Sequence, residues 1–189
     1  AGIEVEILDG QASMHKHVLE VPQEFAYLKR YYQPGNLSPF KLFGHYRHYG
    51  LPWEEMRERI RQARADVIGI TALFTPFYRE ALHVAALAKA VDPMRPVIMG
   101  GAHVNACPAQ VLADPHVDFV VLGEGERTFP ELVHALGDNR LAAMSRICGV
   151  GYKTRNKLIL PEHGDLIEDI DVLPLPARDL IDPARYTLG

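Results

Sequence analysis

Three short segments of this sequence carry groups suited to holding a polar ligand. They are Thr71-Ala-Leu-Phe-Thr75-Pro76, Gly100-Gly101-Ala-His103 and Gly123-Glu-Gly-Glu126. The first offers hydroxyl groups, the second lets a ligand approach the backbone at two glycines, and the third offers two carboxylates. Each segment also has a purely structural interpretation: a helix cap at Thr75, a tight turn at the glycine pair, and solvated loop acids at Glu124 and Glu126.

The apolar pattern places each segment directly after a strand. Strands are predicted at 66–71, 96–99 and 117–122, between helices at 53–63, from Thr75-Pro76 to Val91, at 108–113, and from a capping box at Thr128 to Gly137. Short apolar strands alternating with helices predict a doubly wound, flavodoxin- or Rossmann-like α/β domain with a parallel sheet. Ligands of such sheets bind beyond the carboxyl ends of the strands, so the three segments are expected to share one edge.

The two ends of the chain have a different pattern. Residues 3–9 alternate apolar and acidic side chains, which predicts a strand, and residues 10–52 form an insertion with a short helix near Gln23–Tyr32. Residues 147–153 and 157–160 predict a hairpin, and the proline-rich tail after it predicts a linker. We expect a domain at 1–137 that contains the insertion, followed by the hairpin and linker at 138–189.

The motifs of the chain also carry a family resemblance. Thr-x-Leu-x-Thr-Pro is followed by Gly-Gly and then by Val-Asp-x-Val-Val-x-Gly-Glu-Gly-Glu, and the tail contains Leu173-Pro-Leu-Pro-Ala-Arg-Asp-Leu180. Together these resemble the N-terminal cobalamin (vitamin B12)-binding domain of cobalamin-dependent radical S-adenosylmethionine enzymes, either methyltransferases or oxidative cyclase-like enzymes. The resemblance covers residues 1–9 and 53–189 but not the insertion at 10–52.

The resemblance implies a cofactor-holding role. The dimethylbenzimidazole tail of cobalamin would thread between the sheet and its helices, and the corrin would serve methyl transfer or related radical chemistry done by a downstream domain. The implied cofactor-binding residues are Thr71, Leu73, Thr75, Gly100, Gly101, His103, Gly123, Glu124, Gly125 and Glu126. For His103, contact with cofactor or substrate stands beside the simpler interpretation of a loop histidine.

Two motifs of the family are missing. The cobalt-ligating Asp-x-His-x-x-Gly is absent, and the nearest string, Asp114-Pro-His116, precedes a strand and is interpreted as a loop at the opposite edge. That motif follows a first strand, which we expect upstream of Ala1, so the chain is interpreted as a truncated domain. The Cys-x-x-x-Cys-x-x-Cys motif is also absent, because the chain holds only Cys107 and Cys148. An iron–sulfur (4Fe–4S) cluster and S-adenosylmethionine are therefore expected only in the downstream domain, and the chain is expected to bind rather than catalyse.

Composition excludes several other classes of protein. The 189 residues are 48% hydrophobic with a net charge of −4, which excludes a disordered chain and disfavours a nucleic-acid binder. Two cysteines exclude a disulfide scaffold. No membrane span or signal peptide is seen, so the cytoplasm is the expected compartment. The histidine pairs His15/His17 and His45/His48 lack a third ligand and are interpreted as surface or packing residues, not a metal site.

Alternatives to cofactor binding stay open. The domain could have kept the fold and lost cobalamin, acting as a structural or interaction module, and a flavodoxin-like or response-regulator domain is a weaker alternative. The expected partners are a corrinoid, the downstream radical domain and a second copy of the chain. The second copy follows from the missing first strand, whose loss would expose strand edges to pairing.

Overall fold

The computed structural model describes residues 2–11, 15–31, 35, 46–138, 144–155, 157–162, 164 and 166–182. The chain divides into two compact units, one made of Ala1–Met56 with Ala177–Gly189 and the other of Arg57–Pro176. The second unit contains the sheet and the three predicted ligand-binding segments. None of the helices in the described ranges is both long and apolar enough to cross a bilayer.

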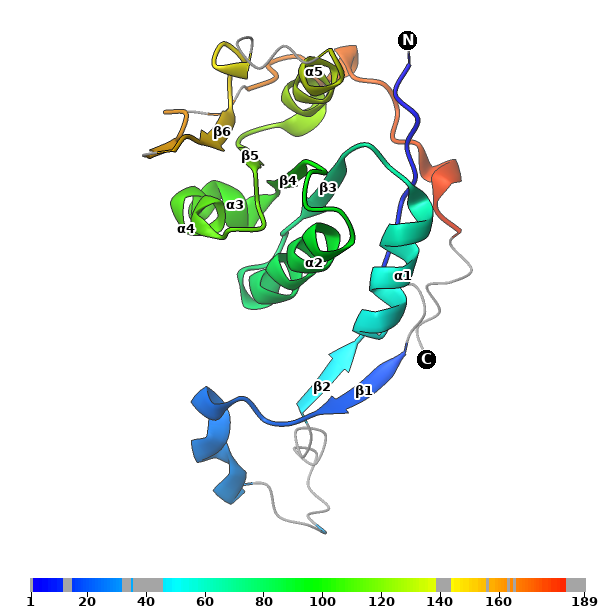
Figure 1. The fold of residues 1–189 in the computed structure, drawn as a ribbon, viewed down its shortest axis with the longest axis vertical. Coiled ribbons are helices and arrows are strands. Elements are labelled where there is room, and N and C mark those ends of the chain that lie inside the picture. Colours follow the sequence, from blue (N-terminus) through cyan, green and yellow to red (C-terminus); the bar gives the residue numbers. More distant parts are fainter. Residues whose placement is uncertain are drawn as a thin grey trace. The chain divides into compact units, whose positions relative to one another are not determined.

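A five-stranded sheet forms the centre of the second unit (Figure 1). Its order is β3 (Ile68–Thr71), β4 (Val97–Gly100), β5 (Phe119–Val121), β6 (Val150–Lys153) and β7 (Leu158–Ile159). The first three strands are parallel, whereas β6 and β7 are antiparallel to their neighbours. The predicted hairpin is therefore present and extends the sheet, which makes the sheet mixed rather than wholly parallel.

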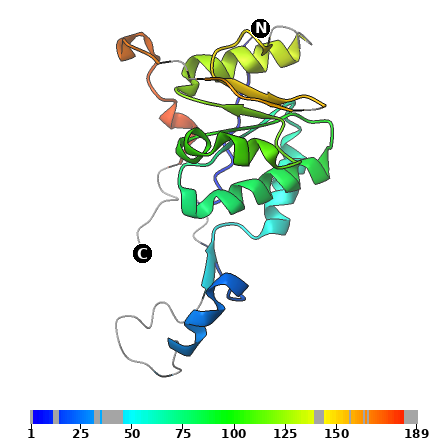
Figure 2. The ribbon, with the colours of Figure 1, turned by 90° about the vertical axis from the view of Figure 1, so that its left-hand side faces the viewer.

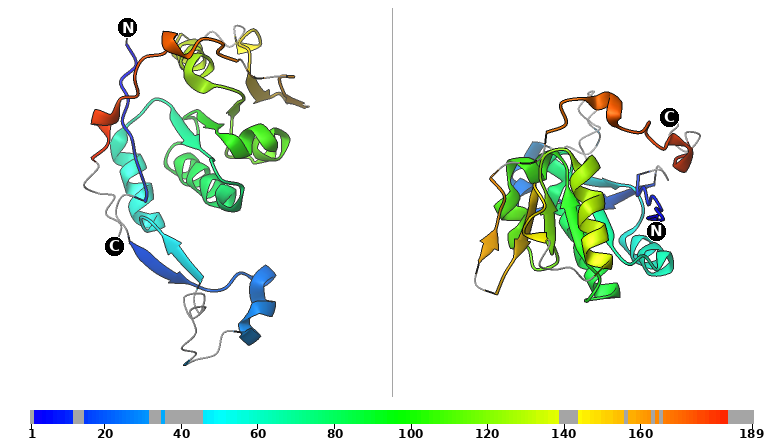
Figure 3. Two further views of the ribbon diagram at one scale, coloured as in Figure 1. Left: turned by 180° about the vertical axis from the view of Figure 1, so that it is seen from behind. Right: turned by 90° about the horizontal axis from the view of Figure 1, so that it is seen from above.

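Helices cover both faces of this sheet. Figures 1 and 2 show α5 (Gly125–Gly137) on one face, with α2 (Tyr78–Val91), α3 (Ala102–Ala106) and α4 (Pro108–Ala113) on the other. The left panel of Figure 3, which shows the chain from behind, shows the same division. Strand β4 lies at the centre of the core, and its side chains Val97, Ile98 and Met99 are at most 1% exposed. Helix α1 (Trp53–Ala63) begins in the first unit and ends in the second, with the bounds that the sequence predicted.

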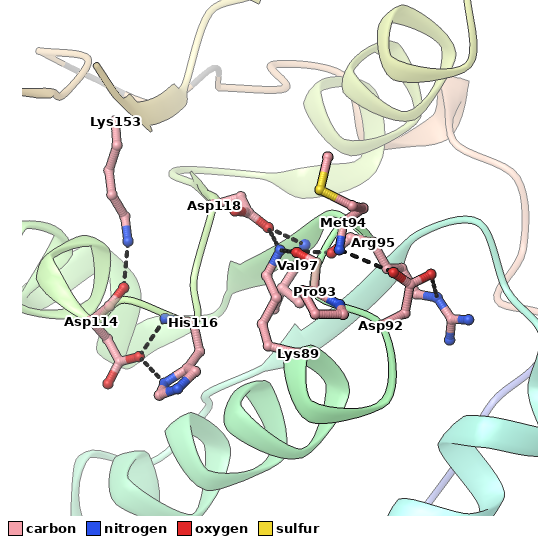
Figure 4. A network of polar contacts seen from close by, with 10 residues as sticks. All are labelled: Lys89, Asp92, Pro93, Met94, Arg95, Val97, Asp114, His116, Asp118 and Lys153. Carbon is pink, nitrogen blue, oxygen red and sulfur yellow. Dashed lines mark hydrogen bonds and ion pairs between the residues drawn. The ribbon is translucent and has the colours of Figure 1, made fainter. Parts of the chain in front are cut away.

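The amino ends of the central strands are held by a polar network (Figure 4). Lys89 of α2 pairs with Asp118 at 2.6 Å and also donates to the carbonyl of Arg95 at 2.8 Å. Asp118 accepts the backbone N–H of Val97 at 2.8 Å, so one carboxylate joins a helix end to two strands. Lys153 of β6 donates to the carbonyl of Asp114. This edge is opposite the one that carries the predicted ligand-binding segments.

The first unit contains a two-stranded antiparallel ribbon. β1 (Lys16–Leu19) and β2 (Tyr46–Tyr49) pair with His17 opposite His48. The predicted strand at 3–9 is wrong: this segment is described and irregular, and Ile3, Val5 and Ile7 are 41–57% exposed. Alternating residues form a strand only where a neighbouring strand accepts their hydrogen bonds. The helix predicted near Gln23–Tyr32 is instead a 3₁₀ helix at Gln23–Tyr31.

Two predicted helix starts are also wrong. Thr75 does not cap a helix, because it opens a short 3₁₀ turn (Thr75–Phe77) and α2 begins at Tyr78. Thr128 lies inside α5, which starts three residues earlier, directly after the loop that follows β5. Thr128 as a whole is 1% exposed, and its hydroxyl donates to the carbonyl of Cys148 at 3.1 Å. In both cases the threonine hydroxyl forms a tertiary contact that a local capping pattern cannot reveal.

Candidate functional site

The loops after the three parallel strands are joined to one another by the short helix α3. The backbone N–H of His103, in its first turn, donates to the carbonyl of Ala72 after β3 at 3.0 Å. The side-chain oxygen of Asn105 accepts the N–H of Gly123 after β5 at 2.8 Å. Residues from all three predicted segments are therefore fixed relative to one another at the carboxyl edge, as the sequence predicted for such a sheet.

The two glycines of the pair have different surroundings. Close packing requires a glycine at position 101, whereas position 100 has room for a side chain. Gly101 has φ +109°, and a Cβ added to it would lie 2.9 Å from the carbonyl oxygen of Ala72 and 3.1 Å from Oγ1 of Thr71. Only glycine fits there, because both the backbone conformation and the space exclude a side chain. A Cβ on Gly100 would meet its nearest neighbour, the Val121 carbonyl oxygen, at 3.7 Å, which is ordinary contact.

His103 is the most buried polar side chain among the predicted site residues, at 2% exposure. Its Nδ1 lies 3.2 Å from Oγ1 of Thr75, and its ring centroid lies 4.6 Å from that of Tyr78. Its Nε2 is buried and has no hydrogen-bond partner among the described residues. The interpretation of His103 as an ordinary loop histidine is therefore wrong: it is a helical, buried residue that connects α3 to the segment after β3.

The segment after β3 exposes large apolar side chains. Leu73, Phe74 and Phe77 are 56–61% exposed, and the two phenylalanine rings meet edge to face at 6.5 Å. Exposed apolar groups gathered at the binding edge of a sheet provide a surface on which a flat, partly apolar ligand can lie. The structure thus places both hydroxyl and apolar groups beside the glycine pair.

The acidic segment after β5 has a different environment. Glu124 accepts the backbone N–H of Ile167 at 2.7 Å, so this carboxylate anchors the segment that follows the hairpin. Gly125 and Glu126 form the start of α5, where a carboxylate stabilises the helix N-terminus.

Of the predicted site residues, the structure links Thr71, Thr75, Gly101 and His103 by direct contact or close approach, and Gly123 through Asn105.

Sequence reasoning missed two residues of this site, Asn105 and Tyr78. Both become recognisable only once α3 is known to be helical and to face the start of α2, because their roles depend on contacts to other loops. The string at Asp114, at the opposite edge of the sheet, behaves as predicted: it forms a loop before β5, where its carboxylate accepts the backbone N–H of His116 at 2.9 Å.

Of the two predicted histidine pairs, His17 and His48 lie in the two-stranded ribbon and His15 directly precedes it. The rings of His17 and His48 are 6.4 Å apart, and that of His48 lies 4.4 Å from Trp53. His45 lies outside the described residues. Within the described ranges, no three histidine, cysteine or acidic side chains gather as metal ligands.

Comparison with known proteins identifies the domain. Residues 44–133 match the family described as the B12 binding domain. The chain is 36% identical over 137 residues to an uncharacterized methyltransferase of Pyrococcus horikoshii, covering 72% of the chain and 29% of that protein. It is 32% identical over 154 residues to the anaerobic magnesium-protoporphyrin IX monomethyl ester cyclase of Rubrivivax gelatinosus, covering 79% of the chain and 27% of that protein. The chain thus spans less than a third of the length of these relatives.

The fold agrees with these matches. The chain superposes on the radical S-adenosylmethionine methyltransferase TsrM of Kitasatospora setae, solved with cobalamin and a 4Fe–4S cluster bound, with a TM-score of 0.52. The similarity covers 65% of the chain and 23% of TsrM at 20% identity. With its mostly parallel sheet and its loops gathered at one edge, this chain belongs to the B12-binding domain family.

Proposed function

We propose that this chain is the cobalamin-holding module of a larger radical S-adenosylmethionine enzyme. The observation that carries the proposal is that α3 ties the loops of β3, β4 and β5 together at the carboxyl edge of a B12-binding domain. The work of the module is to bind and orient the corrinoid, while the reaction takes place with groups that another domain supplies.

The residues present fit such a cofactor. Gly100 leaves room beside the backbone of β4, and the orphaned Nε2 of His103 offers a buried polar group. The nucleotide tail would be held by Thr71, Thr75, Gly100, Gly101 and His103, with Leu73 beside them and the turn Gly123–Glu126 closing the site. When bound, cobalamin supplies a cobalt centre that can carry a methyl group. The protein residues orient it by packing and hydrogen bonding.

The parent reaction is proposed to be methyl transfer or an oxidative cyclisation in a downstream domain. Relatives of both kinds match this chain, and the segment Leu173–Leu180 is similar to the lead-in to a radical domain. That domain would hold the 4Fe–4S cluster and S-adenosylmethionine, since the two cysteines of this chain are too few for a cluster. We also propose the cytoplasm as the compartment, where the thiols of Cys107 and Cys148, which form no disulfide, would stay reduced.

The test is a visible absorption spectrum after mixing with hydroxocobalamin and desalting. The wild-type chain is expected to retain corrin colour, and Gly100→Val is expected to lose it, because valine fills the space beside β4 while its Cβ makes only ordinary contacts. Gly137→Ala is the matched control, since nothing lies within 4 Å of a Cβ there. Wild-type protein without colour at micromolar concentration would instead favour a module that has lost its cofactor.

A further inference from the structure

We propose that Glu124 is a positioning residue, which couples occupancy of the corrinoid site to the order of the segment that follows the hairpin. This post-hairpin segment consists of residues 164 and 166–176. The inference rests on the proposed function and goes beyond it, because Glu124 acts on the backbone of this segment and not on the ligand. A loaded module would then present a fixed segment to the next domain, and an empty module a looser one.

The first observation is the joint between Glu124 and the post-hairpin segment. Oε2 of Glu124 accepts the backbone N–H of Ile167 at 2.7 Å, and Ile167 is only 4% exposed. Three residues earlier, the backbone of Gly164 lies so close to Gly123 that a Cβ added to Gly164 would overlap the Gly123 backbone. The segment is therefore attached at Gly123 and Glu124, by a hydrogen bond to a carboxylate and by backbone packing.

The second observation is that Gly123 also connects the joint to the ligand-binding edge. Its N–H donates to the side chain of Asn105 at 2.8 Å, and the helix that carries Asn105 is bonded to the carbonyl of Ala72 after β3. A continuous path of hydrogen bonds and peptide bonds thus runs from the loop after β3, through Gly123 and Glu124, to Ile167. A ligand that orders one side of Gly123 and Glu124 can favour the contact on their other side.

The third observation is that the post-hairpin segment is weakly packed apart from Ile167. Four of its apolar side chains are 59–92% exposed: Leu166, Ile170, Val172 and Leu175. The N–H groups of Asp171 and Leu173 bond to groups within the segment, so these bonds do not attach it to the sheet. A segment with few buried side chains opens at a low free energy. Its attached and detached forms are the two states whose balance a ligand can shift.

The direction of the coupling follows from linkage. A corrinoid that packs against the turn Gly123–Glu126 restrains Glu124 and so stabilises the attached form. Couplings between two sites typically change an equilibrium constant about 5–150-fold, and they are reciprocal. Loss of the joint should therefore weaken corrinoid binding by the same factor by which the corrinoid stabilises the joint. A direct contact between Glu124 and the ligand requires no such equality.

The experiment follows the amide of Ile167, which is the donor of the joint. Its hydrogen exchange is measured by NMR without and with saturating hydroxocobalamin, and absorbance titration gives the dissociation constant of hydroxocobalamin. The variants are Glu124→Ala, which removes the acceptor, Glu124→Gln, whose amide oxygen can still accept, and Gly164→Ala, which forces the segment away from Gly123. Glu131→Ala is the matched control, because Glu131 is an exposed carboxylate on α5.

The expected result links exchange to affinity. In wild type, hydroxocobalamin should slow the exchange of the Ile167 amide about fivefold or more. Glu124→Ala and Gly164→Ala should speed this exchange, remove its dependence on the corrinoid, and weaken binding by about the factor measured in wild type. Glu124→Gln should recover part of both effects, and Glu131→Ala should match wild type. Circular dichroism establishes that each variant is folded.

Other outcomes separate this inference from the proposed function. Wild type that binds no hydroxocobalamin overturns both. Wild type that binds it with no change in the exchange of Ile167 keeps the proposed function and overturns the coupling. Weaker binding by Glu124→Ala, with the affinity of Gly164→Ala unchanged, would make Glu124 a ligand contact and overturn its positioning role. If neither alanine variant folds, the exchange of Ile167 in wild type and in Glu124→Gln decides by the same criterion.

Discussion

At the scale of single residues, the site depends on a glycine that no other residue can replace. Gly101 combines φ +109° with an approach to the Ala72 carbonyl that leaves only 2.9 Å for a Cβ. We expect Gly101→Ala to lower the free energy of unfolding by about 1–3 kcal/mol, the usual cost of a forced backbone conformation. The reason is local: the alanine must push α3 away from the loop after β3.

Chemical denaturation of Gly101→Ala and of the control Gly137→Ala measures this effect. Gly137 has open space around its Cβ position and ends a helix, so the control should show little change. Equal stabilities of the two variants would mean that α3 does not pack on the Ala72 carbonyl as described, and the arrangement of the site would need revision.

At the scale of elements, the amino ends of β4 and β5 are stabilised by one ion pair. The side chain of Lys89 is 14% exposed and that of Asp118 is 35% exposed, and the carboxylate also accepts the N–H of Val97. Asp118→Ala should therefore destabilise the domain by about 1–3 kcal/mol, because it leaves a mostly buried ammonium without its charged partner. The midpoint of urea unfolding measures the loss.

The surface pair of Glu58 and Arg61 on α1 is the control for this prediction. These side chains are 45% and 64% exposed, and pairs of this kind contribute little to stability. Glu58→Ala should leave the urea midpoint almost unchanged. A loss as large as that of Asp118→Ala would show that charge alone, and not burial with a shared carboxylate, explains the effect.

Strand β6 carries a lysine, Lys153, whose charged form is disfavoured by burial in the folded state. Burial lowers the pKa of Lys153 below its usual 10.5, although Asp118 and Asp114 partly offset it. Between the folded and unfolded pKa values the unfolded chain binds more protons, so the free energy of unfolding rises with pH in that alkaline window. We expect wild type to gain stability relative to Lys153→Gln as the pH rises from 7.5 toward 10.5.

Denaturation at pH 7.5 and at pH 10 checks the sign. Lys157→Gln, an exposed lysine on the same hairpin, should show no such difference from wild type between the two pH values. A relative loss of stability for wild type at pH 10 would contradict the prediction, because it would mean that the charged form of Lys153 is favoured by the fold.

The elements also show how far the sequence alone leads. Local patterns predicted the parallel strands, α1, α4 and the hairpin, because apolar periodicity there agrees with the burial that the sheet imposes. They failed where tertiary contacts decide. The alternating segment at 3–9 has no strand beside it, and Thr75 and Thr128 bind distant groups instead of capping helices. The site residues were found by strand position, but Asn105 and Tyr78 needed the three-dimensional contacts of α3. The division of the chain near residue 137 stays a prediction.

At the scale of the whole molecule, the C-terminal segment exposes apolar side chains that another domain could cover. Within residues 166–182, Leu166, Ile170, Val172 and Leu175 are 59–92% exposed. The matched relatives are more than three times as long as the segment that this chain covers. A proline-rich segment with regularly exposed apolar side chains suits docking against a following domain, which supports the proposed radical domain as the partner.

The open edge of β3 leads to the last prediction. Among the described residues, β3 pairs with β4 on one side and with no strand on the other. The N–H groups of Ile68 and Ala72 bond to β4 and its approach, so by alternation those of Gly69 and Thr71 point to the open edge. Unpaired edges invite pairing, so we expect the isolated chain to associate through this edge as a homodimer or larger species.

Sedimentation across a dilution series should then show an average mass that rises with protein concentration. Hydrogen exchange should show protection of Gly69 and Thr71 that rises with concentration, while Ile68 and Ala72 stay protected throughout as the internal control. A single monomeric species at every concentration would contradict the prediction, and would mean that the exposed edge is too short, at four residues, to hold a second copy.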